Sequence, residues 1–272
     1  MKKFVSVIIV LLAMSTACYA VTTNISVEGR LDATGNISAA NFFGGGMNIT
    51  DLGALKGITI LTAASGNYTV PTGVTDIEVT LIGGGGAGGG AATNTNGHCA
   101  VGGGGGGGAC TIKRIATSAS TVYSYVAGAG GTGVSAGAGN PGVQTTFNAG
   151  AITANGGSGG TNMASGLTVL TAAGGAGGTA GATGDFNGVG GAGGAGYRMS
   201  GTTGISGWGG ATLYGSRSVS VFVPAAQAAT TGTTGVLYGG GGAGGMAMQT
   251  AAAQNAAGGA GAAGVIIIRE FK

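Results

Sequence analysis

The sequence predicts a mainly β fold in which polyglycine-II helices pack as a lattice, flanked by β-strands, with almost no α-helix outside an N-terminal leader. Three observations predict it: glycine supplies 67 of the 272 residues, only 6% of residues are charged, and 43% are hydrophobic. Each glycine in a helix costs about 1 kcal/mol relative to alanine, which disfavours long helices. Disordered chains are usually charged and poor in apolar residues, so this chain is expected to fold.

The first twenty residues have the order of a secretory signal peptide. Lys2 and Lys3 precede an apolar run over residues 4–14, and small residues follow as far as Ala20. A charged region, an apolar region and a small-residue cleavage site are the parts that export signals share. We predict a signal peptide over residues 1–20 with cleavage after Ala20; the alternative is a leader retained as an anchor. The protein is therefore expected to be secreted or held at the cell surface.

Residues 21–62 are expected to form a short neck. Residues 25–31 alternate apolar and polar side chains with the period of a half-buried strand. Residues 35–57 resemble the shaft repeat of phage tail fibres, which implies an intertwined β-rich stalk, commonly of three chains. A single copy is too short for a shaft, so the neck is expected to trimerise or to dock on a fibre shaft protein. The matching residues are Gly35, Ile37, Ser38, Ala39, Phe43, Gly44, Gly46, Ile49, Thr50 and Leu52.

Residues 63–272 are expected to form a glycine-rich head. Their glycines gather in blocks at irregular intervals, which excludes collagen, with glycine at every third residue, and a solenoid of fixed period. Polyglycine-II helices make no internal hydrogen bonds, so packed blocks must bond to one another. The alternative is a set of flexible linkers. The blocks are residues 83–90, 102–108, 128–133, 156–160, 174–184, 188–196, 239–245 and 258–264, and their main guest is alanine, at Ala87, Ala176, Ala192, Ala195, Ala243 and Ala260.

Strand-like segments separate these blocks. The last one, Val-Ile-Ile-Ile-Arg-Glu-Phe over residues 265–271, is apolar and β-prone and would aggregate as a bare edge. We predict that it pairs with residues 77–82, so that the first and last strands of the head clamp the blocks between them. Further strands are expected over residues 111–115, 121–126 and 219–223.

Four segments together resemble the glycine-rich tip domain of phage tail fibres, over residues 65–272. They are residues 68–71 with the strand and block that follow, residues 123–131, residues 145–147 with 154–157, and residues 258–268. The resemblance implies stacked polyglycine-II helices whose distal loops recognise outer-membrane proteins or surface sugars of bacteria. The leader is a departure, because phage tail proteins are assembled in the cytoplasm. It favours an exported protein over a virion fibre.

Large side chains between the blocks are the candidate ligand-binding residues, because exposed Trp, Tyr, Arg and Met dominate recognition surfaces. The alternative for each is packing against the strands or the lattice ends. They are Tyr197, Arg198, Met199, Trp208, Tyr214, Arg217, Met246, Met248 and Gln249. In an exported chain Cys99 and Cys110 form either a disulfide or two buried thiols.

No enzyme chemistry is indicated. His98, the only histidine, adjoins Cys99 without an acidic residue nearby to orient it, and the seven acidic residues are scattered. No catalytic residue, metal site or cofactor is therefore predicted. The net charge of +3 includes Lys2 and Lys3 of the leader, so nucleic acid is not an expected partner.

These observations favour a non-enzymatic exported adhesin whose head recognises a cell-surface protein or glycan. One alternative is a structural subunit of an extracellular filament or matrix, in which strands pair between chains. Another is an ice-binding protein with flat Ala and Thr faces, although the regular glycine repeats of such proteins are missing.

Overall fold

The computed structural model describes residues 43–44, 47–48 and 55–272, apart from residues 94, 224–228 and 249–252. The predicted signal peptide over residues 1–20 and most of the predicted neck lie outside the described residues. The chain divides into two units, Met1–Asp51 and Leu52–Lys272. In the first, β1 (Phe43–Gly44) pairs with β2 (Met47–Asn48) in antiparallel register.

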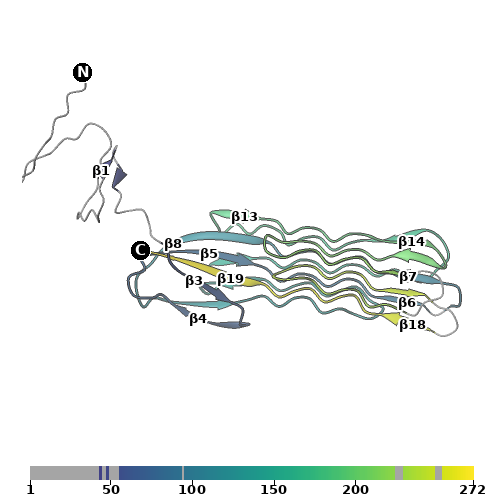
Figure 1. The fold of residues 1–272 in the computed structure, drawn as a ribbon. Helices are drawn as coiled ribbons and strands as arrows, with labels where there is room; N and C mark the ends of the chain where they lie inside the picture. Colours follow the sequence, from purple (N-terminus) through teal and green to yellow (C-terminus); the bar gives the residue numbers. More distant parts are fainter. Residues whose placement is uncertain (1–42, 45–46, 49–54, 94, 224–228, 249–252) are drawn as a thin grey trace, which may run out of the picture. The chain divides into compact units, whose positions relative to one another are not determined.

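The second unit is built from strands at two ends with extended glycine segments running between them (Figure 1). We call the end that holds β5 and β19 the basal end and the end that holds β7 and β14 the distal end. No helix occurs in the described part of the chain, and the fold is mainly β, as predicted.

Two antiparallel sheets form the basal end. The order of the larger sheet is β13 (Phe186–Gly188), β8 (Cys110–Ala116), β5 (Asp76–Ile82), β19 (Val265–Phe271) and β3 (Leu55–Leu61). The smaller sheet has the order β11 (Ile152–Ala154), β10 (Thr145–Phe147), β9 (Val122–Val126) and β4 (Ser65–Thr69).

The predicted pairing of the last strand is confirmed. In β19, Ile267 lies opposite Thr80 of β5 on one side. On its other side Ile267 lies opposite Ile60 of β3, a pairing that the sequence did not predict. Residues 55–61, assigned from the sequence to the neck, are therefore an edge strand of the head, and the described head begins before residue 63.

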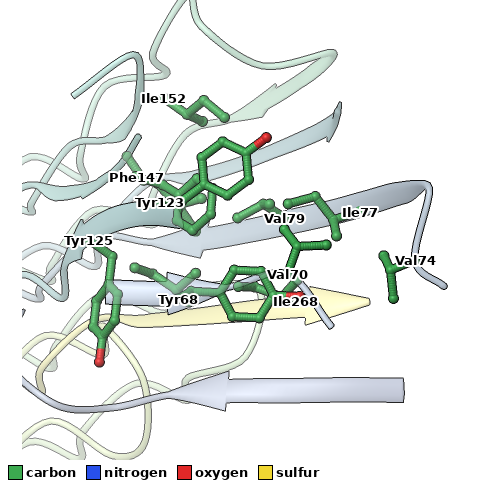
Figure 2. Packing of buried hydrophobic residues seen from close by; sticks show 13 residues of the cluster. Tyr68, Val70, Val74, Ile77, Val79, Tyr123, Tyr125, Phe147, Ile152 and Ile268 are labelled. Carbon is green, nitrogen blue, oxygen red and sulfur yellow. The ribbon is translucent and has the colours of Figure 1, made fainter. Parts of the chain in front are cut away.

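The hydrophobic core lies between the two basal sheets (Figure 2). Alternate residues of β5, such as Ile77 and Val79, point into it and are fully buried. The rings of Tyr123 and Phe147, from the smaller sheet, pack with their centroids 5.2 Å apart. This core gathers most of the largest fully buried side chains of the head, whereas the glycine segments have no side chains to bury and are held by their backbones.

Three small sheets form the distal end. One has the order β12 (Leu170–Ala172), β14 (Gly196–Ser200), β15 (Thr203–Ile205) and β16 (Phe222–Val223). The others pair β17 (Met246–Met248) with β7 (Cys99–Val101) and β18 (Gln254–Ala256) with β6 (Ala91–Thr93).

The glycine segments between the ends bond to one another with a period of three. The N–H groups of Gly103, Gly104 and Gly105 donate to three different segments, and Gly106 returns to the first. Their acceptors are the carbonyl groups of Thr161, Gly194, Gly242 and Ser158. Three residues per turn is the geometry of the polyglycine-II helix, so each helix can bond to neighbours on all sides.

Two helices, residues 83–90 and 102–109, lie at the centre of the lattice. They run antiparallel, and the N–H groups of Gly83, Gly86 and Gly89 donate to the carbonyl groups of Ala109, Gly106 and Gly103. Each is surrounded by six neighbours, the other central helix included. Around residues 102–109 lie residues 83–90, 155–161, 173–179, 189–195, 207–211 and 239–245. Around residues 83–90 lie residues 102–109, 128–134, 137–143, 155–161, 239–245 and 258–264.

The lattice needs glycine for space. A Cβ atom at Gly104 would lie 1.8 Å from the carbonyl oxygen of Trp208, and one at Gly105 would lie 2.2 Å from that of Gly86. Both glycines have ordinary negative φ, so it is the close approach of backbones that excludes a side chain. In an outer helix of the lattice every third residue faces solvent, and alanine occurs mainly at such positions, as at Ala173 and Ala176. Ala87 and Ala243 are exceptions, because both are fully buried.

Candidate functional site: an aromatic face of the glycine lattice

Two exposed residues, Tyr197 and Phe222, and the half-buried Ile205 share the outer side of the distal sheet. Tyr197 of β14 lies opposite Ile205 of β15, and Ile205 lies opposite Phe222 of β16. Directly opposed residues of an antiparallel sheet point to the same face. Tyr197 is 44% exposed and Phe222 is 56% exposed. The sheet therefore presents a row of apolar side chains to solvent.

The row continues onto the lattice because its helices repeat every three residues. Trp208 follows Ile205 by three residues, and Val219 precedes Phe222 by three. A Cβ atom at Gly194 would lie 2.4 Å from the indole atom Cδ2 of Trp208, so the indole packs on that glycine. We call Tyr197, Ile205, Trp208, Val219 and Phe222 the aromatic face.

A cavity of about 360 Å³ opens beside Trp208. The guanidinium carbon of Arg217 lies 5.9 Å from the centroid of the indole ring, within the range of a cation–π interaction. Ser218 is buried, where its hydroxyl donates to the carbonyl of Gly241 and accepts from the N–H of Gly209. The lining residues are Trp208, Arg217, Ser218, Val219 and Ser220.

Arg198 is 3% exposed, which corrects its prediction as a ligand-binding side chain. It donates through Nε to the carbonyl of Thr168 at 2.6 Å, and through Nη1 to the carbonyls of Ala164 at 2.7 Å and Cys99 at 3.1 Å. An arginine has five donors in a planar fork, so one side chain can tie residues 164–168 to β7. Arg198 is thus a support beneath the distal sheet.

Met246 and Met248 are also buried, with exposed fractions of 0% and 2%, which corrects their prediction as binding residues. They lie on β17 and pack against Cys99, Val101 and other side chains under the distal sheet. A flexible thioether fills irregular gaps between small residues. Gln249 lies outside the described residues.

Met199 and Tyr214 are exposed, as expected, but they lie at opposite ends of the head. Met199 is on β14 at the distal end, two residues from Tyr197. Tyr214 follows the lattice segment that runs to the basal end, where its hydroxyl contacts Arg269 of β19 and raises the pKa of that guanidinium. Among the predicted residues, Tyr197 and Trp208 belong to the aromatic face, and Arg217 lies beside Trp208.

Cys99 and Cys110 are buried free thiols, so the alternative of a disulfide is wrong. The helix over residues 102–109 runs between β7 and β8 and spans roughly 25 Å at about 3.1 Å per residue. Bridged cysteines need Cα atoms within about 7 Å. Burial raises the pKa of each thiol to about 11, so both stay protonated at neutral pH.

Ile205, Val219 and Phe222 belong to the face but were missed as binding residues. The signal that could have found them is the spacing of three, which links residues 205 and 208 and residues 219 and 222. In the described part of the chain, no three His, Cys, Asp or Glu side chains are grouped to hold a metal ion. Over the same residues, no helix has the length and apolar character that crossing a membrane requires.

The fold and the aromatic face define a β protein built on a polyglycine-II lattice, with apolar side chains displayed on its outer surface. The glycine-rich domain family matches residues 61–270, and the chain belongs to that family. No curated protein matches the sequence.

Proposed function

We propose that this protein is a non-enzymatic, exported adhesin or receptor-binding tip whose head recognises a cell-surface protein or glycan. The observation that carries the proposal is the aromatic face. Tyr197, Trp208 and Phe222 are each more than two-fifths exposed on one side of a bonded lattice. Exposed aromatic side chains on a preorganised scaffold lose little conformational entropy when they bind a partner.

Export and the tail-fibre relationship belong to the same proposal. The residues that resemble a signal peptide would deliver the head outside the cell. The resemblance to phage tail-fibre tips supports recognition of bacterial surfaces, and the neck would join three chains or attach the head to a fibre shaft protein. Membership of the glycine-rich domain family is consistent with such a head.

The test is cell binding by the labelled chain starting at Val21. A variant carrying Tyr197→Ser, Trp208→Ser and Phe222→Ser is expected to lose binding to a panel of bacterial cells. The matched control carries Leu55→Ser, Ile58→Ser and Ile60→Ser, which removes three exposed apolar side chains of the basal end. Equal binding by both variants would exclude the aromatic face as the recognition surface, and a wild-type chain that binds no cell would exclude the adhesin.

A second candidate is a subunit of an extracellular filament. The observation in its favour is β3, an edge strand of the basal sheet on which Leu55, Ile58 and Ile60 are more than half exposed. An exposed apolar edge is a template for pairing with another chain. Light scattering distinguishes the candidates, because filament subunits form polymers that Ile58→Lys with Ile60→Lys disrupts, whereas an adhesin head stays a monomer or trimer.

A further inference from the structure

The cavity beside Trp208 combines an apolar ring with a positive charge that lacks an acidic partner. In the described part of the chain, ion pairs hold Lys113, Arg114 and Arg269 at the basal end. Arg217 belongs to none of them, and the sequence has no Asp or Glu between Asp185 and Glu270. The guanidinium is exposed, and its one described contact is with the indole ring.

The shape of the site suits a ring with one apolar side. Trp208 is 42% exposed although it packs on Gly194, so part of its surface is open to a ligand. Val219, 68% exposed, extends this apolar surface. Ser220 also lines the cavity and is half-buried. An apolar wall with a few convergent polar groups is typical of small-ligand sites.

We propose that this cavity binds a carboxylated pyranose, such as a uronic acid unit of a surface polysaccharide. The C–H side of the sugar lies against the indole of Trp208, and its carboxylate accepts hydrogen bonds from the guanidinium of Arg217. A guanidinium matches a carboxylate in a two-pronged geometry that an ammonium cannot reproduce. The inference rests on the proposed function and names the chemical class that the aromatic face recognises.

Trp208 is the only tryptophan in the chain, so its fluorescence reports directly on the cavity. We would titrate the chain starting at Val21 with trigalacturonic acid, with its uncharged methyl ester, and with triglutamate. The acid is expected to change the emission and to bind at least about tenfold more tightly than the ester. Charge-assisted hydrogen bonds of this kind give tenfold or larger effects. Added salt should weaken the binding of the acid but not the binding of the ester.

Two variants test the charge. Arg217→Gln keeps the fluorescent ring. It is expected to lower the affinity for trigalacturonic acid by about tenfold, to the affinity that the wild-type chain has for the ester. Arg114→Gln is the matched control, because Arg114 is exposed at the basal sheet and pairs with Asp76 there. It should leave the affinity unchanged.

The outcomes separate this inference from the adhesin. Equal affinity for acid and ester, or equal affinity for trigalacturonic acid and triglutamate, would overturn the acidic-sugar assignment. If none of the three probes binds while the aromatic-face variant still abolishes cell binding, the adhesin stands and this inference fails. If the wild-type chain binds neither cells nor sugars, both fail.

Discussion

The hydroxyl group of Tyr68 donates a hydrogen bond to Oε1 of Glu270 over 3.0 Å, joining the start of the head to its last strand. The same carboxylate oxygen accepts from the hydroxyl of Thr59 on β3, and Glu270 is 6% exposed. A buried carboxylate needs such donors, because an unpartnered charge in the interior is strongly destabilising. Three strands of two basal sheets therefore meet at one side chain.

Removing the Tyr68 hydroxyl should weaken this meeting point. Tyr68→Phe is expected to lower the free energy of unfolding by about 1–3 kcal/mol, because Glu270 loses a donor inside the protein. Urea denaturation followed by circular dichroism measures the change. Tyr125→Phe is the control, since the Tyr125 hydroxyl points out of the cluster in Figure 2. An equal loss in both variants would show that the hydrogen bond to Glu270 adds nothing beyond the removal of a tyrosine hydroxyl group.

A methyl group inside the lattice should be far more damaging than one at its margin. Gly105→Ala places a Cβ atom 2.2 Å from the Gly86 carbonyl oxygen and is expected to cost about 3 kcal/mol or more. Gly137→Ala is the control, because its Cβ atom would approach only the Val134 side chain, at 3.1 Å. Thermal unfolding compares them, and similar melting temperatures would contradict a lattice held by close backbone contact.

Arg198 should matter for stability more than for recognition. Arg198→Lys retains the charge but loses the planar fork that reaches three carbonyl groups. We expect a loss of about 2 kcal/mol in the free energy of unfolding. Tyr197→Ala, one residue away on the exposed face, should leave stability nearly unchanged and reduce cell binding. If Arg198→Lys reduced cell binding without lowering stability, Arg198 would be a binding residue after all.

The thiols predict a pH dependence. The pKa values of Cys99 and Cys110 rise from 9.0 to about 11 on folding because the thiols are buried. Between these pH values the unfolded chain loses the thiol protons while the folded chain keeps them, so the free energy of unfolding falls as pH rises. Urea titrations at pH 8 to 11 measure the slope, which Cys99→Ala with Cys110→Ala should make shallower; an unchanged slope would contradict the assignment.

The raised pKa of Tyr68 acts in the same direction at higher pH. Burial and the bond to Glu270 hold its phenol protonated in the folded protein, so stability falls further once the unfolded chain ionises above pH 10. Tyr68→Phe should remove this further fall.

Both thiols should also resist a thiol reagent until the protein unfolds, because their side chains are enclosed.

The sequence was sufficient for the fold class and for the pairing of β19 with β5, because the apolar run of β19 needed a partner and the alternation of β5 offered one. It was insufficient for β3, because residues 55–57 fell within the shaft-like repeat and the local sequence does not show that residues 55–61 pair with the distant β19. Residue type alone predicted Met246 and Met248 to be binding residues. They are instead enclosed, because they lie on the short strand β17 and pack in a buried cluster. Phe222 was missed because its place on the face depends on its pairing with Ile205 of β15, which the local sequence does not show.

The period of three also governs how such a protein can change. Adding or deleting a single residue in a lattice helix would turn every later side chain by one-third of a revolution and direct side chains that now face solvent against a neighbouring backbone. A change of three residues would keep each position facing as before. The length of these helices is thus expected to vary by multiples of three residues, whereas the loops at the distal end are free to vary one residue at a time.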